Sequence, residues 1–565
     1  MNKFFKHIIP AAALILGGAM FTACTGDLNV EPIDPSLQTE IDPGQLFTKC
    51  YANFAVAGQG GANGDSDVDG IDGGTSGLYR QMWNSNELTT DEAMCVWGDP
   101  GIPEFNYCTY DGSHPMLRGY YYRLYVGIAF CNQYLQDFAD YNSTWTAEVR
   151  FLRALDYFLL MDAYGNVPFV TSVSSEKPRQ ASRQELFDFV ESELLAVIGE
   201  KANDNANILN DPKPKKKGEA GYGRVDKAAA WLLLSRLYLN AQVYTGTNNE
   251  PNGTARWSDA KNYAQLVMNS PYEINTTEVE HTENGITYTW TPYQMLFMGD
   301  NDRTNAANEC IFALIQDGQR TTSWGVSLFL MASTHDESMH SSPFDAGAIN
   351  GVSGQAWGGN HARPELVRLF FPDFDPIDGQ AYDVAYDAGD DRALFTSRGH
   401  TVEIADPTKF TDGLGVGKFS NFTTDGSTTS DATFPDMDVF FFRKAEAYLT
   451  YAEAEIRLNG VTQDAVDAVN VLRNRAHATK FNTNTLTLDK MLDEWGREFY
   501  FEGRRRMDLV RFDKFGGNVS YRWAWKGGTQ SGASFERYRN IFAIPTTDII
   551  ANRENLKQNA GYGDL

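Results

Sequence analysis

The stretch "MLDEWGREFYFEGRRRMDLVRFDKF", residues 491–515, combines aromatic side chains with an unusually dense set of charges. Its acids and bases stand at helical spacings, and the main ones are Glu498, Glu502, Arg504, Arg505 and Asp508. Oppositely charged side chains three or four residues apart on a helix pair with one another. The stretch therefore predicts a structural ion-pair network, and it needs no catalytic explanation.

Outside this stretch, segments with helical periodicity occur in pairs. Residues 145–168 carry apolar side chains at helical spacing and end at Gly165 and Pro168, and the next segment opens with Ser182 and Glu185 in a capping-box pattern. Further pairs follow, and the predicted set is 44–57 with 118–140, 145–200, 224–271 and 439–478. The fold class predicted is mainly α, with four tetratricopeptide-like helix pairs that form a curved support.

Two long regions, residues 58–117 and 272–437, show no sustained helical period and are rich in Gly, Asp, Asn and aromatic residues. Long ordered loops in a compact protein usually carry function. We expect the two regions to meet on one face and to form the ligand-binding face of a single domain, residues 44–565.

The N-terminus has the order of an export signal. Two lysines precede an apolar core, residues 8–21, which is followed by small residues before Cys24 and is too short for a membrane span, so residues 1–23 are predicted to be a signal peptide. The pattern resembles a lipoprotein box, so we expect lipidation of Cys24 and an extended tether over residues 24–43; the alternative is an ordinary secretory signal with a chance cysteine. No other stretch approaches 18 apolar residues, which favours an anchored protein over a spanning one.

Composition excludes some classes of partner. The formal charge of −26 argues against nucleic acid, and the only basic run is residues 213–218. Aromatic residues make up 13% of the chain, which suits a surface that stacks on sugar rings. Five cysteines remain after Cys24, without CxxC spacing, so buried thiols are expected in place of a zinc site or a disulfide framework.

Catalytic motifs are scarce. The chain has eight histidines and neither a GxSxG elbow nor Walker spacing, and no pair of acids stands out as acid and base, although sequence alone leaves glycoside hydrolysis open. Two acidic segments, 299–305 and 434–440, offer alternating oxygen ligands for a structural Ca²⁺. Its candidate ligands are Asp300, Asp302, Asp436 and Asp438. The alternative is that these side chains cap turns and helices.

A family resemblance follows from three segments: residues 491–515, residues 538–562 ("YRNIFAIPTTDIIANRENLKQNAGY") and residues 147–168 with their Gly-Asn-Val-Pro ending. Together they resemble the SusD/RagB family of outer-membrane glycan-binding lipoproteins. Further motifs, among them "GLYRQMWNSNELTTDEA" at residues 77–93, are similar to the starch-binding founder of that family. The resemblance implies a non-enzymatic cell-surface protein, without catalytic residues, that covers a SusC-like TonB-dependent β-barrel transporter.

The resemblance also implies a binding site. Trp97, Trp324 and Trp357 match an arc of aromatic residues that cups an α-glucan, and Arg80 matches an arginine that binds sugar hydroxyls. Further candidates for hydroxyl contacts lie in matching loops: Asp65, Asp67, Asp91 and Arg392. The alternative is that these side chains only brace the loops. The acidic segments 299–305 and 434–440 also have counterparts in the starch binder.

Two departures weaken the case for starch. Cys95 stands where the family member has another tryptophan, and Pro100 stands where an asparagine is expected. The predicted function is capture of an oligosaccharide, with an α-glucan first and a fructan or another glycan as the alternative. Two rivals from other classes are a surface glycosidase, which would release product, and a structural envelope protein, in which the tryptophans would not affect glycan binding.

Overall fold

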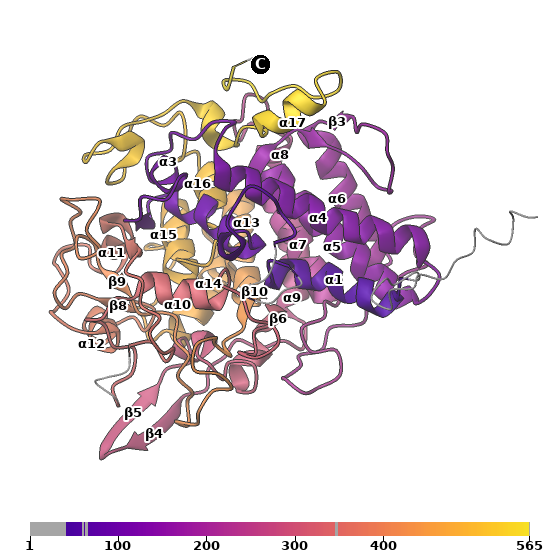
Figure 1. Cartoon of the computed structure of the whole chain (residues 1–565). Helices are drawn as coiled ribbons and strands as arrows, with labels where there is room; N and C mark the ends of the chain where they lie inside the picture. The colour runs from indigo at the N-terminus through magenta and orange to yellow at the C-terminus, as the bar shows by residue number, and fades with distance from the viewer. Residues whose placement is uncertain (1–40, 59–61, 63–65, 345–348, 564–565) are drawn as a thin grey trace, which may run out of the picture. The chain divides into compact units, whose positions relative to one another are not determined.

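A computed structural model describes residues 41–58, 62, 66–344 and 349–563 of the chain (Figure 1). The chain divides into two units, residues 1–46 and 47–565, and helix α1 (Pro43–Ala55) begins in the first and ends in the second. The predicted signal peptide 1–23, Cys24 and the tether as far as residue 40 lie outside the described residues. The other described helices and strands all belong to the second unit.

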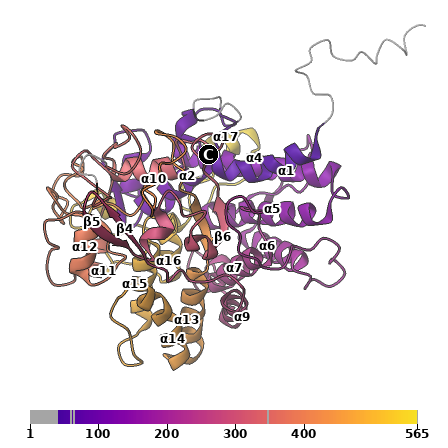
Figure 2. The same cartoon turned by 90° about the horizontal axis from the view of Figure 1, so that it is seen from below.

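The longer helices form one side of this unit (Figures 1 and 2). They are α4 (Pro115–Asp137), α5 (Ser143–Tyr164), α6 (Arg183–Val197), α7 (Lys227–Leu239), α9 (Trp257–Met268), α13 (Ala445–Asn459) and α14 (Gln463–Arg475). The structure packs α5 against α6, α7 against α9 and α13 against α14, which are the partners expected from sequence. Successive pairs also pack on each other, through α6 with α7 and α9 with α13, whereas α4 packs on α5 and on α2 (Leu78–Trp83).

Local sequence sets the ends of these helices. The Ser182 side chain accepts a hydrogen bond from the Glu185 N–H, and Glu185 accepts one from the Ser182 N–H at 2.8 Å, so the predicted capping box is present at the start of α6. Gly165 caps the C-terminus of α5 and Gly460 caps that of α13, and both glycines have positive φ. No helix in the described residues is long and apolar enough to cross a bilayer.

Short elements fill the other side of the unit, where Figure 2 shows α10, α12 and the β4–β5 hairpin. The remaining helices are α3 (Ile102–Asn106), α8 (Ala241–Tyr244), α10 (Ser327–Thr334), α11 (Pro364–Phe370), α12 (Ala381–Ala388), α15 (Leu488–Phe499), α16 (Arg505–Arg511) and α17 (Thr546–Ala551). Single turns are η1 (Gly73–Thr75), η2 (Asn84–Leu88), η3 (Gln294–Phe297), η4 (Asn305–Asn308), η5 (Lys526–Gly528) and η6 (Arg537–Asn540).

The strands form antiparallel pairs. They are β1 (Ala93–Cys95) with β7 (Asn360–Ala362), β2 (Val167–Pro168) with β3 (Gln180–Ala181), β4 (Val279–Glu283) with β5 (Ile286–Trp290), β6 (Cys310–Leu314) with β10 (Val439–Arg443), and β8 (Phe395–Thr396) with β9 (Gly415–Val416). Because β1 belongs to residues 58–117 and β7 to residues 272–437, their pairing brings the two loop-rich regions together.

The stretch 491–515 is not one helix. Helix α15 ends at Phe499 and α16 begins at Arg505, and between them Phe501 and Gly503 take positive φ angles of 62° and 80°. Of the charges predicted to pair along a helix, Arg504 and Asp508 do so at 3.1 Å. Glu498, Glu502 and Arg505 instead find partners outside the stretch, so much of the predicted ion-pair network forms through tertiary contacts.

Candidate functional site

The three tryptophans singled out from sequence stand in a row. The ring centroids of Trp97 and Trp357 lie 6.2 Å apart with planes at 49°, and those of Trp357 and Trp324 lie 6.1 Å apart at 35°. All three side chains are half-buried. An indole that is anchored on one side and open on another presents an apolar face with a polar edge.

Strand pairing places two of these indoles. Trp97 follows β1, whose Cys95 is paired with Asn360 of β7, and the Val96 N–H donates to the Gly359 carbonyl at 3.0 Å. Trp357 precedes β7, and its backbone N–H donates to the Ala332 carbonyl of α10 at 2.6 Å. A Cβ atom on Gly359 would lie 2.3 Å from the Trp97 ring, so the indole packs directly on the glycine backbone.

Arg80 of α2 lies beside the row. Its guanidinium carbon is 5.9 Å from the Trp97 ring and 4.8 Å from the Phe329 ring, and its Nη1 donates to the Gly74 carbonyl at 3.3 Å. Burial lowers the pKa of Arg80 to about 10, and its Nε atom has no hydrogen-bond partner among the described residues. The side chain is thus a cation with donor capacity left over.

A hollow of about 420 Å³ opens at this point, and the described residues that line it are Ala62, Asp72, Gly73, Gly74, Arg80, Trp324 and Trp357. Asp72 is exposed and adds a carboxylate opposite in charge to Arg80. Sequence reasoning missed Asp72, since nothing in "SDVDGIDGG", residues 66–74, distinguishes it from Asp67 or Asp69. The hollow therefore offers apolar ring faces together with one donor group and one acceptor group.

The other described candidates from sequence, Asp67, Asp91 and Arg392, do not line the hollow. Asp67 accepts a hydrogen bond from the buried Arg123 at 3.2 Å, and Asp65 lies outside the described residues. Asp91 is buried, where it binds Arg505 at 2.8 Å and accepts from the Tyr521 hydroxyl at 2.6 Å. Arg392 is fully buried as well. Asp91 and Arg392 are ion-pair residues of the interior, which corrects the expectation that they contact a ligand.

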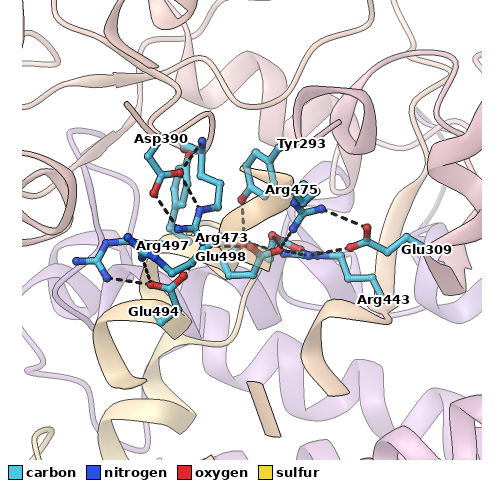
Figure 3. A network of polar contacts seen from close by, with 12 residues as sticks. Tyr293, Glu309, Asp390, Arg443, Arg473, Arg475, Glu494, Arg497 and Glu498 are labelled. Carbon is cyan, nitrogen blue, oxygen red and sulfur yellow. Dashed lines mark hydrogen bonds and ion pairs between the residues drawn. The ribbon is translucent and has the colours of Figure 1, made fainter. Parts of the chain in front are cut away.

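Figure 3 shows a network of polar contacts around Glu494 and Glu498, both of which pair with Arg392. Arg392 contacts Asp390 at 2.8 Å, Glu494 at 2.8 Å and Glu498 at 3.2 Å. Arg443 of β10 extends the network to Glu309 of the loop region at 3.2 Å. Carboxylates and guanidinium groups that are all paired in this way fix the relative positions of the segments that carry them.

The four aspartates considered as Ca²⁺ ligands form ion pairs or hydrogen bonds with other residues of the protein. Lys217 Nζ lies 2.9 Å from Asp302, and Arg303 lies 3.1 Å from Asp302 and 3.7 Å from Asp436. Asp300 and Asp438, both buried, complete the set.

These last two also accept protein hydrogen bonds. Asp300 binds the Thr424 N–H at 2.8 Å and its hydroxyl at 2.6 Å, and Asp438 binds the Gln316 N–H at 2.7 Å and the Tyr222 hydroxyl. In the described part of the chain no group of three or more His, Cys, Asp or Glu side chains is arranged to hold a metal ion. The contacts of the aspartates agree with the alternative of turn-stabilising carboxylates, but among the described residues Asp300 Oδ1 is buried without a hydrogen-bond partner and Asp302 Oδ2 is buried with an ion pair and no hydrogen bond, and a structural Ca²⁺ stays a prediction.

The helical support and the aromatic hollow define a class of protein, a ligand-binding protein built on stacked helix pairs. The SusD family model matches residues 395–562. The chain is 36% identical over 598 aligned residues to the starch-binding protein SusD of Bacteroides thetaiotaomicron, and the match covers 99% of this chain and 100% of that protein. This chain therefore belongs to the SusD family.

Solved structures agree in fold. A surface glycan-binding protein A from Bacteroides uniformis superposes with a TM-score of 0.63 at 19% identity, covering 92% of this chain and 99% of its own. Surface glycan-binding protein A from Bacteroides thetaiotaomicron, solved in complex with laminarihexaose, has a TM-score of 0.60 at 17% identity, with coverages of 92% and 98%. A SusD-like protein from Bacteroides fragilis matches with a TM-score of 0.62 at 18% identity, over 92% of this chain and 96% of that one.

Proposed function

We propose that this protein captures oligosaccharides at the cell surface, with Trp97, Trp357 and Trp324 as stacking platforms and Arg80 and Asp72 as hydroxyl partners. The observation that carries the proposal is the row of half-buried indoles beside the hollow. A sugar ring has an apolar C–H face that stacks on an indole and hydroxyls that need donors and acceptors. A starch-binding relative and a neighbour solved with laminarihexaose support the same class of ligand.

An α-glucan such as starch is the ligand class that we propose. The successive rings are tilted by 49° and 35° and are not coplanar, which suits a chain whose units turn relative to one another better than a flat one. The alternative is a fructan or another glycan, because Cys95 is a buried thiol and Pro100 offers no side-chain hydrogen bond.

A non-enzymatic role is part of the proposal. Among the described residues that line the hollow, Asp72 alone is acidic, whereas hydrolysis of a glycosidic bond ordinarily needs two carboxylates. Incubation with a binding polysaccharide is expected to leave its chain length unchanged. Release of short sugars would instead identify a surface glycosidase.

Attachment and delivery complete the proposal. We infer that Cys24 is lipidated, that the protein is anchored in a bacterial outer membrane at the cell surface, and that it passes its glycan to a SusC-like TonB-dependent transporter. Membership of the family and the lipoprotein box support these inferences. Radiolabelled fatty acid should enter the wild-type protein and not the Cys24→Ala variant, and co-purification from membranes should recover a β-barrel partner.

The test of the site is isothermal titration of the chain without residues 1–24 against malto-oligosaccharides, isomalto-oligosaccharides and fructans of both linkages. An exposed stacking contact is worth on the order of 1 kcal/mol, so each of Trp97→Ala, Trp324→Ala and Trp357→Ala should weaken binding about fivefold or more. Trp257→Ala, which removes a half-buried indole from helix α9, is the matched control and should leave binding unchanged. Unchanged binding in all three site variants would favour the structural envelope protein.

A further inference from the structure

A second hollow, of about 450 Å³, lies between the β4–β5 hairpin and the loop of residues 421–432. Its described lining includes the aromatic residues Trp290, Phe344 and Phe422, the acids Glu283 and Asp431, and a run of hydroxyl side chains at residues 427–430. None of the sequence candidates belongs to it. Both hollows combine aromatic rings with a carboxylate, whereas hydroxyl side chains line only the second and a guanidinium lines only the first, among the described residues.

The loop that lines the second hollow also contacts a residue that lines the first. Phe434 packs edge-on against Trp324 of the row, with ring centroids 5.2 Å apart, and two residues earlier Ala432 lines the second hollow. The Ser353 N–H donates to the Ala432 carbonyl at 2.7 Å, and the Asn421 N–H donates to the Asn350 carbonyl at 2.7 Å. The loop that carries Trp357 is thus hydrogen-bonded to the loop that lines the second hollow.

The aromatic side of the second hollow is held in place. The Phe344 ring meets His281 at 5.1 Å, Trp290 at 6.0 Å and Tyr288 at 6.3 Å, in each case nearly edge-on. Three such contacts fix the orientation of the half-buried Phe344 ring. A ligand that stacks on this ring therefore does not have to pay the entropic cost of immobilising it.

Polar groups in this hollow define the ligand class. The Trp290 indole N–H is buried and has no hydrogen-bond acceptor among the described residues, which is unusual for a buried donor. Glu283 is exposed at the rim, and Asp431 accepts hydrogen bonds from the Thr433 and Phe434 N–H groups at 2.7 and 2.9 Å. No described lining residue is basic, so the hollow disfavours phosphate, sulfate and uronic acids.

We propose that the second hollow is a further sugar subsite, which takes the units of a neutral glycan chain that extend past Trp324 over the loop that lines this hollow. The inference rests on the proposed function, because it assigns the ligand of the first site to the second as well. A short oligosaccharide occupies only the first hollow. A longer one also reaches the second hollow and gains affinity from it, because a second contact made by a linked ligand adds to the first.

The test compares three-unit and eight-unit oligosaccharides of each glycan class in the panel by isothermal titration. Phe344→Ala removes the ring platform of the second hollow, and the expected result is a loss of about fivefold or more in affinity for the eight-unit ligand with no change for the three-unit ligand. The matched control is Phe374→Ala, which removes an exposed phenyl ring of the segment between α11 and α12. Trp324→Ala should weaken both lengths.

A second readout does not depend on the variant's stability. In the indole region of an NMR spectrum, the Trp290 signal, assigned by its loss in Trp290→Phe, should shift when the eight-unit ligand is added and stay in place with the three-unit ligand. The subsite is refuted if wild type binds both lengths, Trp324→Ala weakens both, and neither Phe344→Ala nor the Trp290 signal responds to length. Failure of wild type to bind any glycan, or binding that ignores the three tryptophans, refutes the proposed function itself.

Discussion

At the scale of single residues, the aromatic row depends on a residue without a side chain. Trp97 packs on Gly359, where a Cβ atom would lie 2.3 Å from the indole. Gly359 has no positive φ, so alanine is compatible with its backbone and tests steric contact alone. Trp97 could be selected from the sequence, but Gly359 could not. Gly359 is important only because the start of β7 brings its backbone against the Trp97 indole.

Gly359→Ala should therefore displace the Trp97 ring and weaken glycan binding by about threefold to tenfold, with a smaller effect on thermal stability. Gly98→Ala is the control, because a Cβ atom on Gly98 meets nothing within 4 Å and the residue is adjacent to Trp97. Titration of both variants against the binding glycan gives the answer. Equal affinities in the two variants would show that Trp97 does not contact the ligand.

At the scale of elements, buried ion pairs join segments that are distant in sequence. Strand β10 contributes Arg443, which contacts Glu498 of α15 at 2.6 Å and Glu502 at 2.8 Å, with side chains 0–11% exposed. Helix α14 contributes Arg475, which also contacts Glu498. Removing Arg443 leaves Glu309, Glu498 and Glu502 each with one cation fewer in a medium of low polarity, which costs more than the pairs contributed.

Arg443→Met is expected to lower the free energy of unfolding by about 3–5 kcal/mol, because Glu498 and Glu502 lose their shared partner. The control is Arg179→Met, which breaks the Arg179–Glu185 pair at side-chain exposures of 58% and 50%. An exposed pair of this kind contributes about 0–1 kcal/mol. Denaturant unfolding of both variants measures the difference, and similar losses would contradict a structural role for the buried network.

At the scale of the whole molecule, two groups of buried carboxyl side chains have pKa values shifted in opposite directions, so they affect stability in opposite ways as the pH changes. Burial alone would raise the pKa values of Glu494 and Glu498, but Arg392, Arg473, Arg475 and their neighbours bring both down to about 2. Burial raises the pKa values of Glu87 and Glu365 to about 7, and burial together with Asp302 raises that of Asp438 to about 8.

The sign of each effect follows from linkage. A depressed pKa contributes stability that is present above the unfolded value of about 4 and is lost as pH falls toward 2. A raised pKa means that the folded state holds a proton that the unfolded state has released, so stability falls as pH rises from about 4 to 8. We expect maximum thermal stability at about pH 5, measured by calorimetry between about pH 3 and 9.

Asp438→Asn isolates one of these groups. Between about pH 4 and 8 the unfolded wild type ionises Asp438 while the folded state keeps it protonated, which costs stability that the asparagine variant does not lose, so the variant should match the wild type near pH 4 and gain progressively in relative melting temperature up to about pH 8. A constant difference between the two proteins across this range would show that Asp438 is not the titrating group.

Much of the fold was predictable from residues 145–200, 224–271 and 439–478. Helical periodicity and local stop signals, such as the capping box at Ser182 and the glycine at 460, act over a few residues and are visible in the sequence. The helix partners were also predictable, since short connections place consecutive helices side by side. The break between α15 and α16 was not, because Phe501 adopts positive φ under tertiary contacts and not by intrinsic preference.

For the site, the sequence by itself determined the family and the side chains with sugar-binding chemistry: Trp97, Trp324, Trp357 and Arg80. Only the tertiary structure decided which polar residues share the hollow, because ion pairing depends on contacts between segments hundreds of residues apart. It placed Asp91 and Arg392 in the buried network, brought Asp72 to Arg80, and put Lys217 beside Asp302. Side-chain type is a local property, whereas burial and charge pairing are properties of the whole fold.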